Sequence, residues 1–173
     1  RIDTQKVSFS AINHFSLSPA HLFSLGYDFQ EDSVSSSNAY DIDTRNNHAV
    51  LIQYQGEYLQ NQVALAYRSD HNQQFGQNST WNASWGYAFN NGILISASYG
   101  TGFKAPTFND LYWPGAGNPA LKPEKSESYE IGINGKHKNW HWGLNSYLTY
   151  INDLVNWSPD ASGNWLPNNI DSA

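Results

Sequence analysis

Two groups of side chains have residue types and spacings that could bind a metal ion. His137 and His141 are four positions apart, a spacing that suits zinc when both lie on one helix. On a strand the same spacing separates the two groups by about 13 Å, too far to share a metal. Asp41 and Asp43 could offer oxygen ligands to calcium, but the glycine turn and terminal glutamate of an EF-hand loop are missing. We expect a solvated polar loop there, with Asp41 and Asp43 as the calcium candidates.

No catalytic set can be singled out among the many serines, histidines and aspartates, and the sequence lacks cysteine altogether. A cysteine nucleophile, a thiolate metal site and a disulfide framework are therefore excluded. We expect no enzyme.

Segment 100–125 combines residue types that suit a binding loop. Prolines at 106, 114, 119 and 123 restrict its backbone without regular structure. Tyr112 and Trp113 supply flat apolar faces, and Asn109 and Asn118 supply directional hydrogen bonds. Such a loop could hold a large, partly apolar solute. Packing on the rim of a barrel is an equally good interpretation of the same residues.

The composition limits what these residues can belong to. The 173 residues carry 9 Lys+Arg against 15 Asp+Glu, a formal net charge of −6, so no basic field attracts nucleic acid. Methionine is absent and no secretion signal opens the chain, so we expect an internal fragment. Aromatic residues make up 15% and charged residues 14%, yet mean hydropathy is only −0.60. No run of 18 apolar residues predicts a membrane-spanning helix, whereas strands of a membrane barrel remain compatible with these values.

Period-two alternation dominates the chain and predicts strands. In 79–89, Trp81, Trp85 and Phe89 share one face, while Asn82 and Ser84 share the other. We expect eight strands, at about 5–15, 20–30, 48–55, 58–70, 79–89, 93–100, 129–134 and 139–153.

The connections between these strands alternate in length. Short connections are expected at 16–19, 55–57, 90–92 and 136–139, and long ones at 31–47, 71–77, 102–125 and from 154 onward. This is typical of an all-β, antiparallel, up-and-down transmembrane barrel with its short turns in the periplasm. A soluble, aromatic-rich β-sandwich that binds glycans is the alternative.

The sizes of the residues on the two faces of the expected strands predict the size of the barrel. Small and polar residues opposite the rings cannot fill the narrow interior of an eight-stranded barrel. We therefore expect an arc of a larger barrel, whose rings contact lipid and whose hydroxyl, amide and glycine positions line a wide lumen.

Several motifs resemble the barrel signature of TonB-dependent outer-membrane receptors. They are Gly102-Phe103-Lys104-Ala105-Pro106-Thr107, Asp110-Leu111-Tyr112, Gly117-Asn118-Pro119, Leu121-Lys122-Pro123-Glu124-Lys125-Ser126 and Tyr129-Glu130-Ile131-Gly132. The likeness spans the whole chain. Within the family it is greatest to the cobalamin receptors, on Arg68-Ser69-Asp70, Asn72, Gln74-Phe75-Gly76 and Val34-Ser35-Ser36-Ser37. Siderophore and haem receptors share the 102–132 motif and remain alternatives.

The resemblance implies a 22-stranded barrel in the bacterial outer membrane, with a plug and energy from TonB. Residues 1–173 would be a partial barrel domain that lacks the plug and the C-terminal strands. The calcium loops and most cobalamin contacts would belong to other segments. Rim packing is the favoured alternative for each ligand-facing candidate that we name here: Tyr40, Tyr112, Trp113, Asn118, Asn156 and Trp157.

Overall fold

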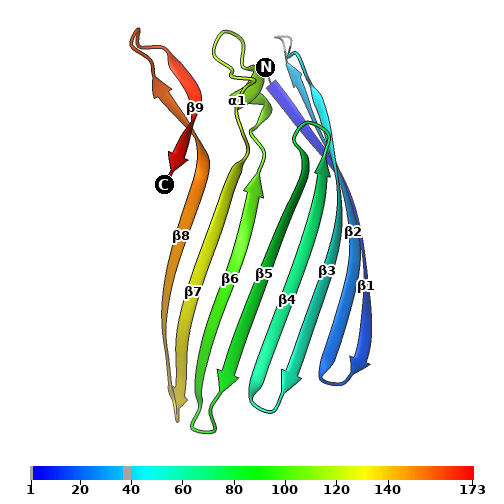
Figure 1. The fold of residues 1–173 in the computed structure, drawn as a ribbon, viewed down its shortest axis with the longest axis vertical. Coiled ribbons are helices and arrows are strands. Elements are labelled where there is room, and N and C mark those ends of the chain that lie inside the picture. Colours follow the sequence, from blue (N-terminus) through cyan, green and yellow to red (C-terminus); the bar gives the residue numbers. More distant parts are fainter. Residues whose placement is uncertain (1, 37–39) are drawn as a thin grey trace.

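The structure is a computed structural model that describes residues 2–36 and 40–173. In these residues nine strands form a single sheet in chain order, and each strand pairs antiparallel with the next (Figure 1). The elements are β1 (Ile2–Ser18), β2 (His21–Ser36), β3 (Thr44–Tyr58), β4 (Asn61–Asn72), β5 (Gly76–Ala88), β6 (Ile93–Lys104), α1 (Phe108–Tyr112), β7 (Glu124–His137), β8 (Trp140–Pro159) and β9 (Trp165–Ser172).

The up-and-down architecture is confirmed, and the alternative β-sandwich is wrong because the described residues form one sheet. The turns that join β1 to β2, β3 to β4, β5 to β6 and β7 to β8 lie at one end of the sheet, and α1 lies at the other end (Figure 1). The expected long connection at 71–77 is wrong, because β4 runs to Asn72 and β5 begins at Gly76, which leaves only a tight turn at 73–75. Ser37, part of one resembling motif, lies outside the described residues. No helix in the described part of the chain is long and apolar enough to cross a membrane.

The expected long loop from 154 onward is wrong, and with it the count of eight strands. β8 continues to Pro159, and β9 returns along it after a tight turn. Asp160 Oδ1 closes this turn by accepting hydrogen bonds from the backbone N–H groups of Ser162 (2.8 Å) and Asn164 (2.9 Å). The turn residues were visible in the sequence, but the strands on both sides lack clear alternation.

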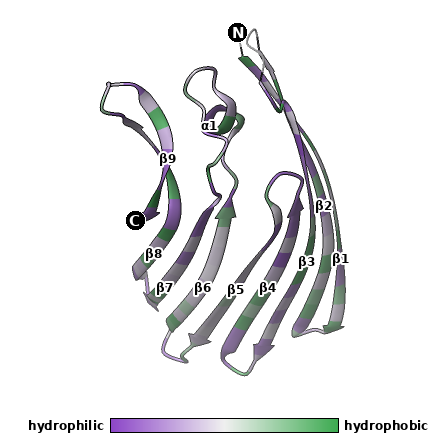
Figure 2. Ribbon diagram, turned by 45° about the horizontal axis from the view of Figure 1, so that its top comes forward, coloured by the Kyte–Doolittle hydropathy of each residue, from purple (hydrophilic) through white to green (hydrophobic). Residues whose placement is uncertain are grey.

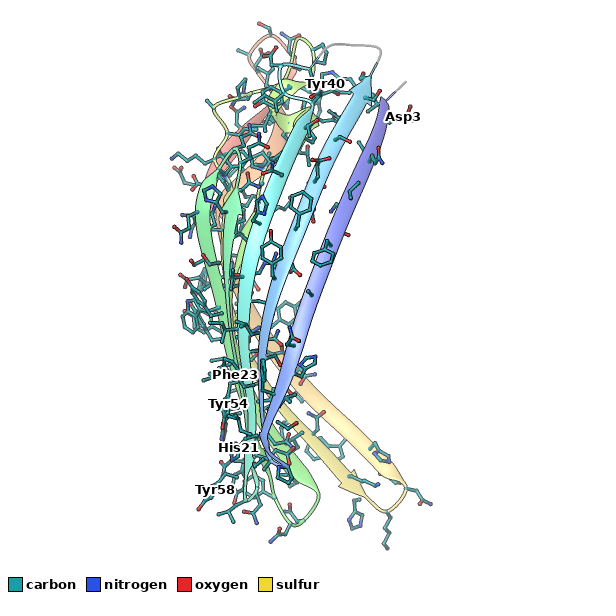
Figure 3. All side chains as sticks on the ribbon, turned by 90° about the vertical axis from the view of Figure 1, so that its right-hand side faces the viewer. Asp3, His21, Phe23, Tyr40, Tyr54 and Tyr58 are labelled. Atoms are coloured by element: carbon teal, nitrogen blue, oxygen red, sulfur yellow. The ribbon has the colours of Figure 1, made fainter. Side chains whose placement is uncertain are left out.

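The expected turn at 55–57 is also wrong. β3 runs on to Tyr58, which pairs with Asn61, and Leu59 takes the left-handed backbone conformation that reverses the chain. Gly56 instead lies within the sheet, opposite His21. A side chain at position 56 would collide with the ring of Tyr54, whose hydroxyl is hydrogen-bonded to His21 Nδ1 at 2.8 Å. Figure 3 labels His21, Tyr54 and Tyr58 together near this end of the sheet.

The face that carries the large side chains is open. Trp81, Trp85 and Ile131 are 47%, 42% and 64% exposed, and no second layer from the described residues covers them. Ring contacts continue from strand to strand: the Tyr99 ring centroid lies 4.6 Å from that of Trp81 and 4.8 Å from that of Tyr129. Apolar and polar positions alternate along most strands (Figure 2). The expected division of the two faces is thereby confirmed.

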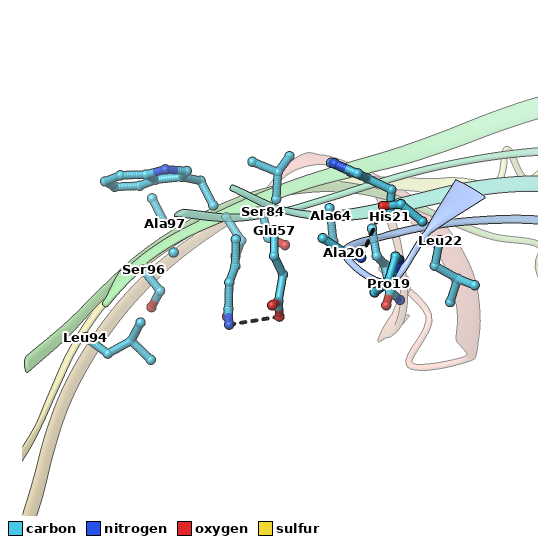
Figure 4. A pocket seen from close by; sticks show the side chains of 18 of the residues that line it. Pro19, Ala20, His21, Leu22, Glu57, Ala64, Ser84, Leu94, Ser96 and Ala97 are labelled. Carbon is cyan, nitrogen blue, oxygen red and sulfur yellow. Dashed lines mark hydrogen bonds between the residues drawn. The ribbon is translucent and has the colours of Figure 1, made fainter. Parts of the chain in front are cut away.

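The opposite face is concave and lined by small and polar residues. Near the short turns it encloses an open trough of about 980 Å³. Figure 4 shows Glu57, Leu94 and Ser96 on the inner side of the curved sheet. The side chains that line the trough are too small to fill the space on the concave side of the sheet. The curvature of an arc of a wide barrel accounts for this shape.

Candidate functional site

The long connection 105–123 folds around α1, a single helical turn that the sequence analysis did not predict. Asp110 Oδ2 accepts hydrogen bonds from Thr107 N (2.8 Å) and Thr107 Oγ1 (2.6 Å), while Asp110 N donates to Thr107 Oγ1. This reciprocal pair is a capping box, which satisfies backbone donors at the start of the turn. Phe108 and Leu111 are buried beneath it.

Asp110 also joins α1 to β8. Trp157 Nε1 donates a hydrogen bond of 2.8 Å to Asp110 Oδ1. Partial burial raises the pKa of the Asp110 carboxyl, but hydrogen bonds from Thr107 and Trp157 outweigh it and hold the pKa below its ordinary value. The carboxylate form is therefore the one that holds the loop to the barrel wall.

Arg45 on β3 holds the other side of the loop. Its Nη1 donates to the carbonyl oxygen of Pro106 at 2.9 Å, and its guanidinium lies 5.0 Å from the ring centroid of Phe108 and 5.8 Å from that of Phe75. Gln74 extends this contact by donating to the Tyr112 hydroxyl at 2.5 Å. The sequence does not point to Arg45, because its hydrogen-bond partner Pro106 lies 61 positions away.

Two asparagines attach the end of the loop to β9. Asn118 Nδ2 donates to the carbonyl oxygen of Pro167 at 3.1 Å. Asn169 Oδ1 accepts from Lys122 N (2.9 Å), and Asn169 Nδ2 donates to Lys122 O (3.0 Å). The loop is thus connected to β3, β8 and β9, which holds its aromatic residues in a defined position.

The ligand-facing candidates divide into two groups. Tyr112, Asn118 and Trp157 use their polar atoms within the loop anchors, and Tyr40 donates from its hydroxyl to Asn109 Oδ1 at 2.8 Å. Trp113 and Asn156 are exposed. Trp113 and Asn156 are thus the candidates with exposed side chains, while the others support the loop.

The metal candidates lie apart from this cluster. Asp41 and Asp43 are exposed, and Asp43 Oδ1 accepts a hydrogen bond from the Thr44 hydroxyl at 3.2 Å. Within residues 2–36 and 40–173, no group of three or more His, Asp or Glu side chains could hold a metal ion. His137 ends β7, and His141 lies on β8 opposite Lys136. Neighbouring register positions place them on opposite faces of the sheet.

A charged cluster lies on the concave face below the loop. Arg68 donates from Nε to Asp70 Oδ2 (2.9 Å) and from Nη1 to Asp28, so it bridges two carboxylates. Ala49 lies between Asp28 and Asp70 in the register and is almost completely buried. Its small side chain leaves room for the guanidinium to cross. The cluster gives the concave face charged, hydrogen-bonding side chains.

The sequence was compared with protein families and with known proteins, and both comparisons match β-barrel receptors or transporters. Residues 3–173 match a family model described as TonB dependent receptor-like, beta-barrel. The chain is 38% identical over 178 residues to the Vitamin B12 transporter BtuB of Photobacterium profundum, covering 100% of this chain and 29% of that protein. It is 38% identical over 173 residues to BtuB of Vibrio vulnificus, covering 96% and 28%. The chain thus spans less than a third of the length of these relatives.

Solved structures share the fold at low sequence identity. The siderophore receptor PirA from Pseudomonas aeruginosa superposes with a TM-score of 0.83 at 16% identity, covering 99% of this chain and 35% of that one. PirA from Acinetobacter baumannii gives a TM-score of 0.75 at 15% identity, covering 99% and 33%.

Proposed function

This chain belongs to the TonB-dependent receptor β-barrel family, and from that premise we propose that it is an arc of an outer-membrane active-transport receptor for cobalamin. The observation that carries the ligand assignment is 38% identity across the whole chain to two proteins named Vitamin B12 transporter BtuB. The siderophore receptors share the fold at 15–16% identity and add no argument about the ligand.

The two faces of the sheet support a position in the membrane wall. The exposed rings of Trp81, Trp85 and Tyr129 suit contact with lipid and its interfaces. The serines, glycines and amides of the concave face suit a water-filled lumen that also holds a plug. In this orientation the short turns face the periplasm, and the loop around α1 lies at the extracellular mouth.

Preorganisation of the loop supports a binding role at that mouth. A loop already held by Arg45, Trp157 and Asn169 loses little conformational freedom when a ligand arrives. Trp113 offers an exposed indole face for an apolar part of cobalamin, and Asn156 offers an exposed amide. We propose these two residues as ligand contacts of this segment.

The remaining parts of the proposal concern the complete receptor. TonB would supply energy through the plug, and calcium would be held by other loops, so this segment receives no resident cofactor. We assign it no catalytic step, in agreement with relatives that are named transporters and receptors.

Uptake and binding in the complete receptor test this proposal. A strain lacking its own cobalamin receptor should regain cobalamin-dependent growth when it expresses the complete protein, and Trp113→Ala with Asn156→Ala should weaken cobalamin binding. Rescue of siderophore or haem uptake, with no cobalamin binding, would overturn the ligand assignment. Asn139→Ala, at a short turn, is the matched control and should leave binding unchanged.

A further inference from the structure

The hairpin formed by β8 and β9 lies at the same end of the sheet as α1 (Figure 1). Trp157 pairs with Pro167 in the register, and Pro159 pairs with Trp165 two positions nearer the tip. Side chains two positions apart on a strand share a face, so these four side chains lie on one face of the hairpin. The indole of Trp157 reaches Asp110 in α1, which identifies this face as the one turned toward the loop 105–123.

The loop covers only part of this face. Pro167 is fully buried, and its carbonyl oxygen accepts a hydrogen bond from Asn118 of the loop at 3.1 Å. Asn169, two positions farther from the tip, is hydrogen-bonded to the loop backbone. In contrast, Trp165 is 61% exposed and Pro159 is also exposed. The apolar surface thus continues from the covered part of the face to an open part near the tip.

The loop leans over the concave side of the sheet. Arg45, which donates to the carbonyl oxygen of Pro106, pairs with Asp32 in the register. Asp32 is four positions from Asp28 on β2, so both share the face of the concave charged cluster. The face of the hairpin that meets this loop is therefore turned toward the lumen. Trp165 faces the mouth of the barrel rather than lipid.

The tip of the hairpin is ordered by its own hydrogen bonds. Asp160 N donates to the carbonyl oxygen of Asn164 at 2.8 Å, and Asn164 N donates back to Asp160 Oδ1 at 2.9 Å. Gly163 takes the left-handed conformation, with a φ of 85°, that closes the turn. Asn164 directly precedes Trp165 in the chain. A ligand that packs on this indole therefore orders little additional backbone.

A single loop residue connects the surroundings of two exposed indoles. Asn118 N donates to the carbonyl oxygen of Asp110 at 2.8 Å, and Asn118 Nδ2 donates to that of Pro167. Trp113, which is 38% exposed, follows Asp110 by three positions, and Trp165 precedes Pro167 by two. The surface near Trp165 is thus continuous with the loop that carries the ligand contact already proposed.

An indole combines a wide apolar face with one N–H donor, and tryptophan is enriched among the residues that dominate binding energy. We propose that Trp165 is a further contact residue for cobalamin and packs against an apolar part of the ligand on the side of the mouth formed by the β8–β9 hairpin. This inference rests on the proposed function, because it takes both the ligand and the extracellular position of the loop from it.

Cobalamin titration of the complete, purified receptor tests the contact. We expect Trp165→Ala to raise the Kd about tenfold, because truncation removes a large apolar contact. Trp165→Phe keeps an aromatic ring and should raise it less, about threefold. Trp140→Ala is the matched control, because it removes a 77% exposed indole at the short-turn end of the sheet, and should leave the Kd unchanged. Heat-modifiable migration checks that each variant is folded.

Shielding of the indole tests the same contact in the unmodified binding site. The complete receptor is labelled with 5-fluorotryptophan, and the ¹⁹F signal of Trp165 is identified by its loss in Trp165→Phe. A soluble gadolinium chelate should broaden this signal in the free receptor, because the indole is exposed. Saturating cobalamin should remove most of the broadening.

Three results would overturn the inference: broadening that cobalamin does not change, an unaltered Kd in Trp165→Ala, or a signal already protected in the free receptor. The last result would assign the indole to packing against another extracellular loop. Cobalamin binding by the wild type separates this inference from the proposed function. Binding with an unshielded Trp165 refutes this inference alone, whereas the absence of binding refutes the ligand assignment and this inference with it.

Discussion

The indole Nε1 of Trp157 on β8 donates a 2.8 Å hydrogen bond to Oδ1 of Asp110 in α1. The two residues are 47 positions apart, and their contact attaches the loop 105–123 to the barrel wall. A hydrogen bond to a charged group contributes more than a neutral one, so we expect this contact to have a measurable effect on loop order.

Replacing Trp157 by Phe removes the donor and keeps most of the ring. We expect the loop 105–123 to lose about 1.5 kcal/mol or more of local stability, because the carboxylate of Asp110 loses a partner. The rate of amide hydrogen exchange in residues 105–123 measures this loss of local stability. Trp165→Phe, at an exposed indole on β9, is the control and should leave exchange unchanged. Equal exchange in both variants would show that the bond does not hold the loop.

The pKa of Asp110 predicts how loop order depends on pH. Its folded-state pKa is lowered, so its contribution is complete above the ordinary carboxyl pKa of about 3.9 and is lost as pH falls through the folded value. We expect hydrogen exchange of 105–123 to be constant near neutral pH and to accelerate, after correction for intrinsic rates, only in that acidic range. Asp110→Asn should remove this acid transition, whereas Asp171→Asn should retain it.

Arg45→Met should disorder the loop more than it destabilises the barrel. The substitution leaves the Pro106 carbonyl without its charged donor and removes the stacking on Phe108, a cost of about 2 kcal/mol or more. In the complete receptor we expect ligand affinity to fall about tenfold. Titration with cobalamin and thermal unfolding together measure the two effects. Lys6→Met, at an exposed lysine, should change neither, and loss of barrel stability without loss of affinity would contradict the prediction.

Trp85 and Ser84 are neighbours on β5 that face opposite sides of the sheet. Lysine in place of Trp85 would put a charge on the lipid-facing side near the short-turn end of β5, which costs up to about 1 kcal/mol close to the membrane interface. Lysine in place of Ser84 would point into the open trough and should be tolerated. Heat-modifiable migration of the complete receptor measures folding. Equal folding of both variants would contradict lipid contact of the ring-bearing face.

Alternation of side-chain size along the chain determined eight of the nine strands and their two faces, and the lengths of the connections indicated the up-and-down order. Each strand has period two, and the size of residues such as Trp81 and Asn82 is a property of the sequence itself. The motif from Gly102 to Gly132 also directed attention to the loop that became the candidate site.

Only the tertiary structure decided the turn at Leu59, the return of β9 and the anchors of the loop. Gly56 resembles a turn residue until the ring of Tyr54 is seen to occupy the space beside it. Arg45 resembles any polar residue at a strand end until Pro106 and Phe108 pack against it. These features depend on which distant residues become neighbours when the sheet curves. Local alternation carries no information about those contacts, because it shows only which face of the sheet a residue is on.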